Sequence, residues 1–158
     1  MLYLLSITLG LCVTYFILYL LFPFFFKNSF IPLTKKSVFS ITCIILFSFA
    51  VYFVSFQISS IDISNRFLHI FGGGFLSFFV CFSVVNDSGL RLNKFQFLVF
   101  SFLIVIALGV ANEIVEFFLQ NYFHFVFART VNDTWLDLLS NLIGALIASV
   151  FFVPFVHD

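Results

Sequence analysis

Charged side chains are scarce in this sequence: seven basic and seven acidic residues make up only 9% of the 158 residues. Apolar residues make up 63%, and they gather in five runs separated by short polar links, about 2–26, 37–56, 67–85, 96–119 and 134–156. At about 1.5 Å per residue, each run can cross roughly 30 Å of hydrocarbon as a helix. No soluble domain remains outside these runs. We therefore predict an all-α polytopic membrane bundle of about five transmembrane helices, forming a single domain over residues 1–158.

Cysteine is also rare, which argues against a zinc site built from thiolates. The three cysteines, Cys12, Cys43 and Cys81, all lie within apolar runs and show no CxxC spacing, so we interpret them as buried thiols. The glycines at 72–74 lie inside a span and lack the context of a phosphate-binding loop, which favours a packing role. The first run has no basic segment before it and no cleavage motif, so we expect a retained span.

Lysine and arginine are distributed unevenly among the links, which predicts an orientation. The first and third links carry five of them and the second and fourth carry two: Lys27, Lys35, Lys36, Arg91 and Lys94 against Arg66 and Arg129. Since positive residues favour the cytoplasmic side, we expect the N-terminus outside and the C-terminus inside.

Four of the seven acidic residues lie inside or beside the last two spans, where an unpaired charge costs roughly 2.5 to 3.5 kcal/mol at mid-membrane. Because alternate spans run in opposite directions, the start of the third span, the end of the fourth and the start of the fifth share one face of the membrane. Helical spacing aligns three polar stripes there: His69, Gly73 and Ser77; Gly109, Glu113, Glu116 and Gln120; Asp133, Asp137, Asn141, Gly144 and Ala148. We expect a three-helix contact with an outward-facing polar pocket.

A plainer interpretation exists for part of this cluster. Asp133 or Thr134 can cap the fifth helix, and Asp137 then completes a capping-box-like pair with Thr134. This does not apply to Glu113 and Glu116, since negative charge is disfavoured near a helix C-terminus. His124, in an aromatic segment, is interpreted as an interfacial anchor.

The order of these motifs resembles the VanZ-like and YjdF-like small inner-membrane proteins of bacteria. The resemblance covers residues 62–148 and depends on Arg66 to His69, the Glu113-x-x-Glu116 pair and the motif from Asp133 to Ala145. It implies Glu113, Glu116, Asp133 and Asp137 as signature acids and Arg129 as a candidate for an arginine that precedes the last motif. VanZ-like proteins are associated with tolerance to glycopeptide antibiotics. The YjdF-like branch implies no particular activity.

Three functional hypotheses follow for a protein of the bacterial cell membrane. The first is a site for a lipid-linked or headgroup ligand, with His69, Asp133, Asp137, Asn141 and Arg129 binding it and a divalent cation held by Glu113, Glu116 and Asp137. If that site is catalytic, Glu113 or Glu116 is the general base. The second is a small proton- or cation-coupled carrier. The third is a purely structural polar cluster. Membrane lipids are the expected partners, nucleic acid is not expected, and a homo-oligomer is compatible with the sequence.

Overall fold

A computed structural model describes residues 2–27, 32–124 and 131–156, and within these ranges it contains helices and no strand. Its elements are α1 (Leu2–Lys27), α2 (Lys35–Gln57), α3 (Ile61–Phe67), the π-helix η1 (Leu68–Phe75), α4 (Leu76–Ser88), α5 (Lys94–Phe123), α6 (Val131–Phe152) and the short 3₁₀-helix η2 (Val153–Phe155). Five helical segments are long and apolar enough to cross a membrane. The prediction of an all-α bundle of five membrane helices is confirmed.

The helices begin at residues with the chemistry that a helix start needs. Thr34 and Ser37 form a capping box at α2, and Asn93 and Gln96 form one at α5. The Ser60 side chain accepts a hydrogen bond from the backbone of Ile63, so α3 begins ahead of the apolar run and includes Asn65 and Arg66. This early start brings two polar residues of the second link into the third span.

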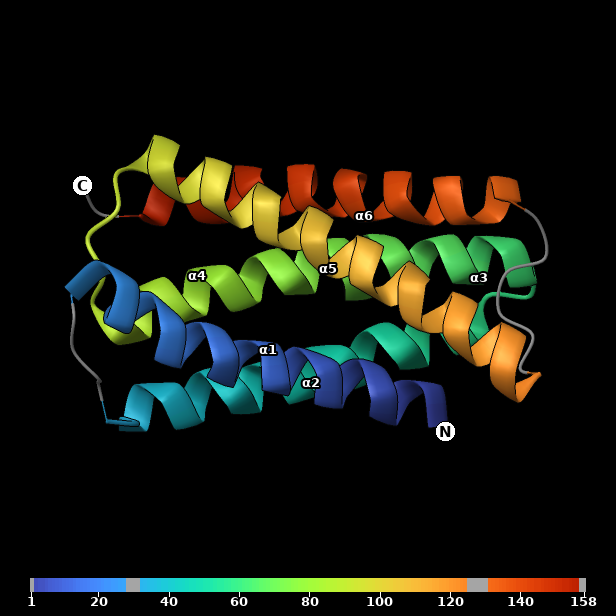
Figure 1. Cartoon of the computed structure of the whole chain (residues 1–158), viewed down its shortest axis with the longest axis horizontal. Helices are drawn as coiled ribbons and strands as arrows, with labels where there is room; N and C mark the ends of the chain where they lie inside the picture. The colour runs from blue at the N-terminus through green and yellow to red at the C-terminus, as the bar shows by residue number, and fades with distance from the viewer. Residues whose placement is uncertain (1, 28–31, 125–130, 157–158) are drawn as a thin grey trace.

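The third span is the core of the bundle (Figure 1). It consists of α3, η1 and α4 in series, and 61% of its most apolar window is buried, against 17–33% for the other four spans. In Figure 1, α1 and α2 lie on one side of it and α6 on the other, with α5 running diagonally across. The start of α3, the end of α5 and the start of α6 lie at the same end of the molecule. The antiparallel arrangement expected from the sequence therefore holds.

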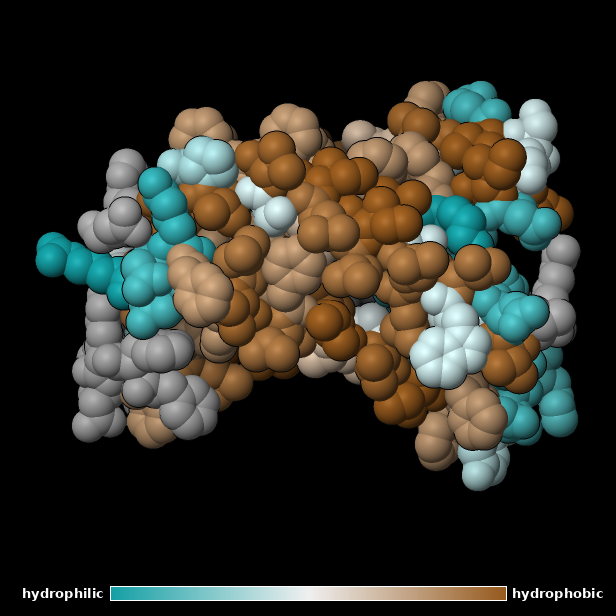
Figure 2. All heavy atoms as spheres, turned by 90° about the horizontal axis from the view of Figure 1, so that it is seen from above, coloured by the Kyte–Doolittle hydropathy of each residue, from teal (hydrophilic) through white to brown (hydrophobic). Residues whose placement is uncertain are grey.

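The surface matches a membrane protein (Figure 2). Hydrophobic atoms cover the middle of the molecule, and hydrophilic atoms gather toward its two ends. Many exposed side chains are phenylalanines, including Phe39, Phe53, Phe56, Phe95 and Phe117. Exposed Phe of this kind suits contact with lipid. All three cysteines are free thiols, but only Cys81 is buried, so the expectation of buried thiols is wrong for the partly exposed Cys12 and Cys43.

Candidate functional site

A salt bridge between the third and fifth spans lies at the centre of the candidate site. The guanidinium group of Arg66 on α3 pairs with the carboxylates of both Asp133 and Asp137 on α6. The same group donates a hydrogen bond of 3.2 Å to the backbone carbonyl oxygen of Asp133. Arg66 and Asp133 are each 21% exposed, whereas the side chain of Asp137 is only 3% exposed. The ion pair thus extends from the rim of the membrane end into the protein.

Asp137 receives donors from three side chains on a single carboxylate oxygen. Besides Arg66, the Asn65 amide donates to Oδ1 at 3.1 Å, and His69 Nε2 lies 3.2 Å from the same atom. His69 is buried in η1, with 6% of its side chain exposed. A buried carboxylate such as that of Asp137 is tolerated only where its charge is paired and hydrogen-bonded, as it is here. Asp137 is therefore the residue through which α3, η1 and α6 are joined.

Glu113 reaches the same place from α5. One ligand atom from each of His69, Glu113 and Asp137 lies within 4.8 Å of the others. Glu113 is half-buried, and its Oε1 atom is buried with no hydrogen-bond partner among the described residues. A carboxylate oxygen in that position carries a cost that a cation, a proton or a donor from a ligand can remove.

One turn deeper, Asn141 lies between two helices that present glycines to it. A Cβ atom on Gly73 would be 3.0 Å from Asn141 Cγ, and one on Gly109 would be 3.0 Å from Asn141 Nδ2. Asn141 is 4% exposed, and its Oδ1 also has no hydrogen-bond partner within the described ranges. The site therefore contains a second unpartnered oxygen below the carboxylates.

The glycines of η1 allow its backbone to touch that of α6. A Cβ atom on Gly74 would lie 2.8 Å from Gly144 Cα, and one on Gly144 would lie 2.9 Å from the backbone nitrogen of Phe75. Real Cβ atoms do not come so close, so glycine is required on both sides. This is the close approach that small residues give membrane helices, and the packing role expected for the glycines at 72–74 is confirmed for Gly74. π-Helical turns are rare and occur frequently at functional sites.

Glu116 lies apart from this group. Its Oε1 accepts a hydrogen bond of 2.8 Å from Asn112, one turn earlier on the same helix. It is half-buried and does not belong to the group of converging His69, Glu113 and Asp137 ligand atoms. His124 is exposed and ends α5 in a left-handed conformation with φ of 59°. Arg129, the cation suggested by the sequence, lies outside the described residues.

The last half of α5 leaves the bundle. The buried residues of α5 end at Gly109, and none of residues 110–123 is buried. Large apolar side chains are exposed there on α5 and on the facing end of α6, including Ile114, Phe118, Trp135 and Leu139. Figure 2 shows a hollow between two lobes at the end that holds the site, and hydrophilic surface lines part of it. Within the described residues, the hollow therefore gives a lateral approach to this end of the molecule.

The comparison with known proteins identifies a family. Residues 4–158 match the family described as "Predicted membrane protein (DUF2238)". The chain belongs to this family. No curated protein and no solved structure matches this DUF2238 protein. The match covers nearly the whole chain, including the two spans that the resemblance seen in the sequence did not reach.

Sequence reasoning on this DUF2238 protein correctly brought His69, Glu113, Asp137 and Asn141 together. The capping interpretation is wrong, because α6 begins at Val131 and Asp133, Thr134 and Asp137 all lie inside it. The main omission was the role of Arg66, with its neighbour Asn65. Arg66 lies just ahead of an apolar run and looked like a link residue. Its spacing of three residues from His69, on one helical face, was the available signal.

Proposed function

We propose that this DUF2238 protein is a bacterial cell-envelope protein whose intramembrane cluster of His69, Glu113 and Asp137 binds a cation together with a lipid-linked or headgroup ligand. The observation that carries the proposal is the buried, unpartnered Glu113 Oε1 beside the other two ligand groups. An imidazole and two carboxylates are suitable ligands for divalent transition metals.

Charge supports a cationic occupant. Among the described residues, Arg66 is the positive side chain paired in the cluster, and Glu113, Asp133 and Asp137 are three negative ones. Since Arg66 already pairs with the two aspartates, Glu113 has no positive partner among these four. A bound cation would neutralise it and would remove much of the cost of holding a carboxylate in the membrane. Asp137 offers its second oxygen, because Arg66, Asn65 and His69 all approach Oδ1.

The lateral approach supports a ligand that comes from the bilayer. Exposed apolar side chains lie on the same half of α5 as the half-buried Glu113 and on the facing end of α6. An amphiphile can place its chain against the apolar residues and its polar group at the cation. The resemblance to VanZ-like proteins and the outward orientation predicted from the link charges agree with a ligand of the outer leaflet, whose polar group Asn141 contacts in this proposal.

The test is thermal unfolding of the detergent-purified protein in Mg²⁺, Ca²⁺, Mn²⁺ and Zn²⁺, each with and without phosphatidylglycerol and phosphatidylethanolamine. A cation at 100 times its dissociation constant stabilises the folded protein by about 2.7 kcal/mol. We expect at least one cation to raise the unfolding temperature of the wild type and not of Glu113→Gln.

Glu116→Gln is the matched control, because it makes the same change one turn away on the same helix and outside the converging group. It should keep the cation response. A wild type with no response to any of the four cations, or a response that survives in Glu113→Gln, contradicts the cation site. A less stable Glu113→Gln protein without any wild-type response would instead support a structural role.

A proton- or cation-coupled carrier is the second candidate, favoured by the π-helix that carries His69 within the third span. π-Helical turns occur frequently at functional sites, and buried acids with a histidine are usual parts of a proton relay. Uptake into proteoliposomes should then depend on a pH or cation gradient. Flux that ignores both gradients would exclude this candidate.

A further inference from the structure

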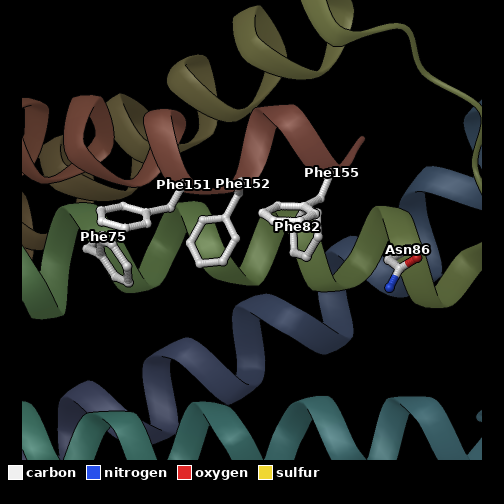
Figure 3. A pocket seen from close by; sticks show the side chains of 6 residues that line it. All are labelled: Phe75, Phe82, Asn86, Phe151, Phe152 and Phe155. Atoms are coloured by element: carbon white, nitrogen blue, oxygen red, sulfur yellow. The ribbon is translucent and has the colours of Figure 1, made fainter. Parts of the chain in front are cut away.

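Two cavities flank α4 at the end of the bundle opposite the His69 cluster. The first lies between the end of η1 with α4 on one side and the end of α6 with η2 on the other, and it has a volume of about 500 Å³. Its lining is almost entirely aromatic: Phe75, Phe82, Phe151, Phe152, Phe155 and Asn86. In Figure 3 the rings lie in a row between the two helices, and Asn86 lies beyond Phe82 at one end of the row. This cavity is an apolar groove with one polar end.

The second cavity lies between α2 and α4 and has a volume of about 380 Å³. It shares Phe82 and Asn86 with the first cavity, so the two grooves meet at the same turns of α4. Phe39 and Phe79 give it an apolar wall. Its polar residues come from the start of α2 and the end of α4, which lie at one end of the molecule (Figure 1).

The polar end of the second cavity carries an excess of positive charge. Lys35 and Lys36 line it and are exposed. Asp87 also lines it, but its carboxylate accepts a hydrogen bond of 2.7 Å from the buried Tyr15 hydroxyl. The lining therefore contains two positive ammonium groups and one negative carboxylate, and that carboxylate already has a hydrogen-bond partner. The hydroxyl side chains of Ser40 and Ser83 lie in the same lining.

We propose that the two cavities together bind one anionic phospholipid. Its phosphate group lies at Lys35 and Lys36, and its two acyl chains occupy the grooves on either side of Phe82. A phospholipid has one charged headgroup and two apolar chains that diverge from it, and here a basic end adjoins one aromatic groove and a second groove with a phenylalanine wall. The excess of positive charge selects a net negative headgroup over a zwitterionic one. Positive residues near the cytoplasmic leaflet attract its anionic lipids, which agrees with the orientation expected for this end.

The experiment is native mass spectrometry of the full chain, released from detergent in the presence of phosphatidylglycerol or phosphatidylcholine with identical acyl chains. We expect the wild type to retain one phosphatidylglycerol in preference to phosphatidylcholine. The Lys35→Gln/Lys36→Gln variant should bind phosphatidylglycerol about 30-fold more weakly, since each lysine near an anionic headgroup contributes about a fivefold factor. Its weak binding of phosphatidylcholine should not change.

Two further variants separate charge from chain contacts. Arg91→Gln/Lys94→Gln removes the same number of positive charges at the same end from residues that line neither cavity, and it should keep the preference for phosphatidylglycerol. Phe155→Ala alters a side chain that is 68% exposed, and it should weaken both lipids equally. Equal affinity of the wild type for the two lipids would overturn the proposal. So would a loss in the control variant as large as that in Lys35→Gln/Lys36→Gln.

Discussion

At the scale of single residues, Asp137 determines how the candidate site is built. Its Oδ1 atom lies against donors from Arg66, Asn65 and His69, so one carboxylate oxygen orients three side chains of the neighbouring span. Asp133 shares the same arginine but lies at the rim, where water can replace a lost contact. The two aspartates therefore have the same chemistry in different surroundings.

Asp137→Asn should destabilise the folded protein more than Asp133→Asn. Removing the buried charge leaves Arg66 and His69 with a poorer acceptor, and hydrogen bonds to charged groups contribute about 1.5–3 kcal/mol each. At the partly exposed Asp133 the loss should stay near or below about 1 kcal/mol. Unfolding in mixed micelles with increasing denaturing detergent measures the free energy of unfolding of the two variants. Equal losses in the two variants would contradict the central position given to Asp137.

The sequence predicted which residues of the last two spans meet, because spacing of four residues places Asp137 above Asn141 on one helical face. It did not predict the partner of these acids. The pairing of Arg66 depends on where α3 begins, and that is set by the Ser60 cap rather than by hydropathy. A charge ahead of an apolar run looks like an ordinary positive link residue until the helix is known to include it.

At the scale of elements, the contact between η1 and α6 holds the site together. These two elements touch through backbone atoms at Gly74 and Gly144, and the Asn141 side chain lies against Gly73. Any widening of this contact would also move His69 away from Asp137, since His69 belongs to η1. Packing and site geometry are therefore coupled through the glycines.

Gly74→Ala should disrupt this contact, and Gly72→Ala should not. A methyl group at position 74 would overlap the backbone of α6, and such overpacking costs about 1–3 kcal/mol or more. At position 72 the nearest atom would be Val51 Cγ1 at 3.9 Å, which is ordinary contact. Detergent unfolding of the two variants, both of which exchange glycine for alanine in the same π-helix, compares them directly. A stable Gly74→Ala protein would mean that η1 and α6 are less closely packed than described.

The π-helix itself could not be predicted from the sequence. Three consecutive glycines at 72–74 indicate close packing, but they do not indicate how the backbone hydrogen bonds are arranged. The diagonal course of α5 was equally inaccessible. Both the lipid-facing side and the protein-facing side of α5 are apolar. Hydropathy therefore does not show which side of this helix is buried. The lateral approach to this end of the molecule follows from that course.

At the scale of the whole molecule, five spans place the two ends of the chain on opposite sides of the membrane. The composition predicted the number of spans well, since apolar runs of about 20 residues with so few charges have few alternatives. The orientation is a proposal that depends on five positive residues near one end against two near the other. It places the His69 cluster outside and the lipid cavities inside.

A C-terminal fusion tests this orientation. With the C-terminus in the cytoplasm, a green fluorescent protein fusion should be fluorescent and an alkaline phosphatase fusion should be inactive. Replacing Lys35 and Lys36 by glutamine should weaken the bias, because positive residues close to span ends set it. An active phosphatase fusion would reverse the assignment and would place the carboxylate cluster on the cytoplasmic side.

The central claim is that His69, Glu113 and Asp137 form one cation site, and direct titration tests it most closely. Calorimetric titration of Mn²⁺ and Zn²⁺ into the purified wild type, Glu113→Gln and Glu116→Gln gives stoichiometry and affinity for each. The account predicts one cation per chain in the wild type and in Glu116→Gln, and a loss of binding in Glu113→Gln. Absence of binding in a folded wild type, or unchanged binding in Glu113→Gln, would contradict it.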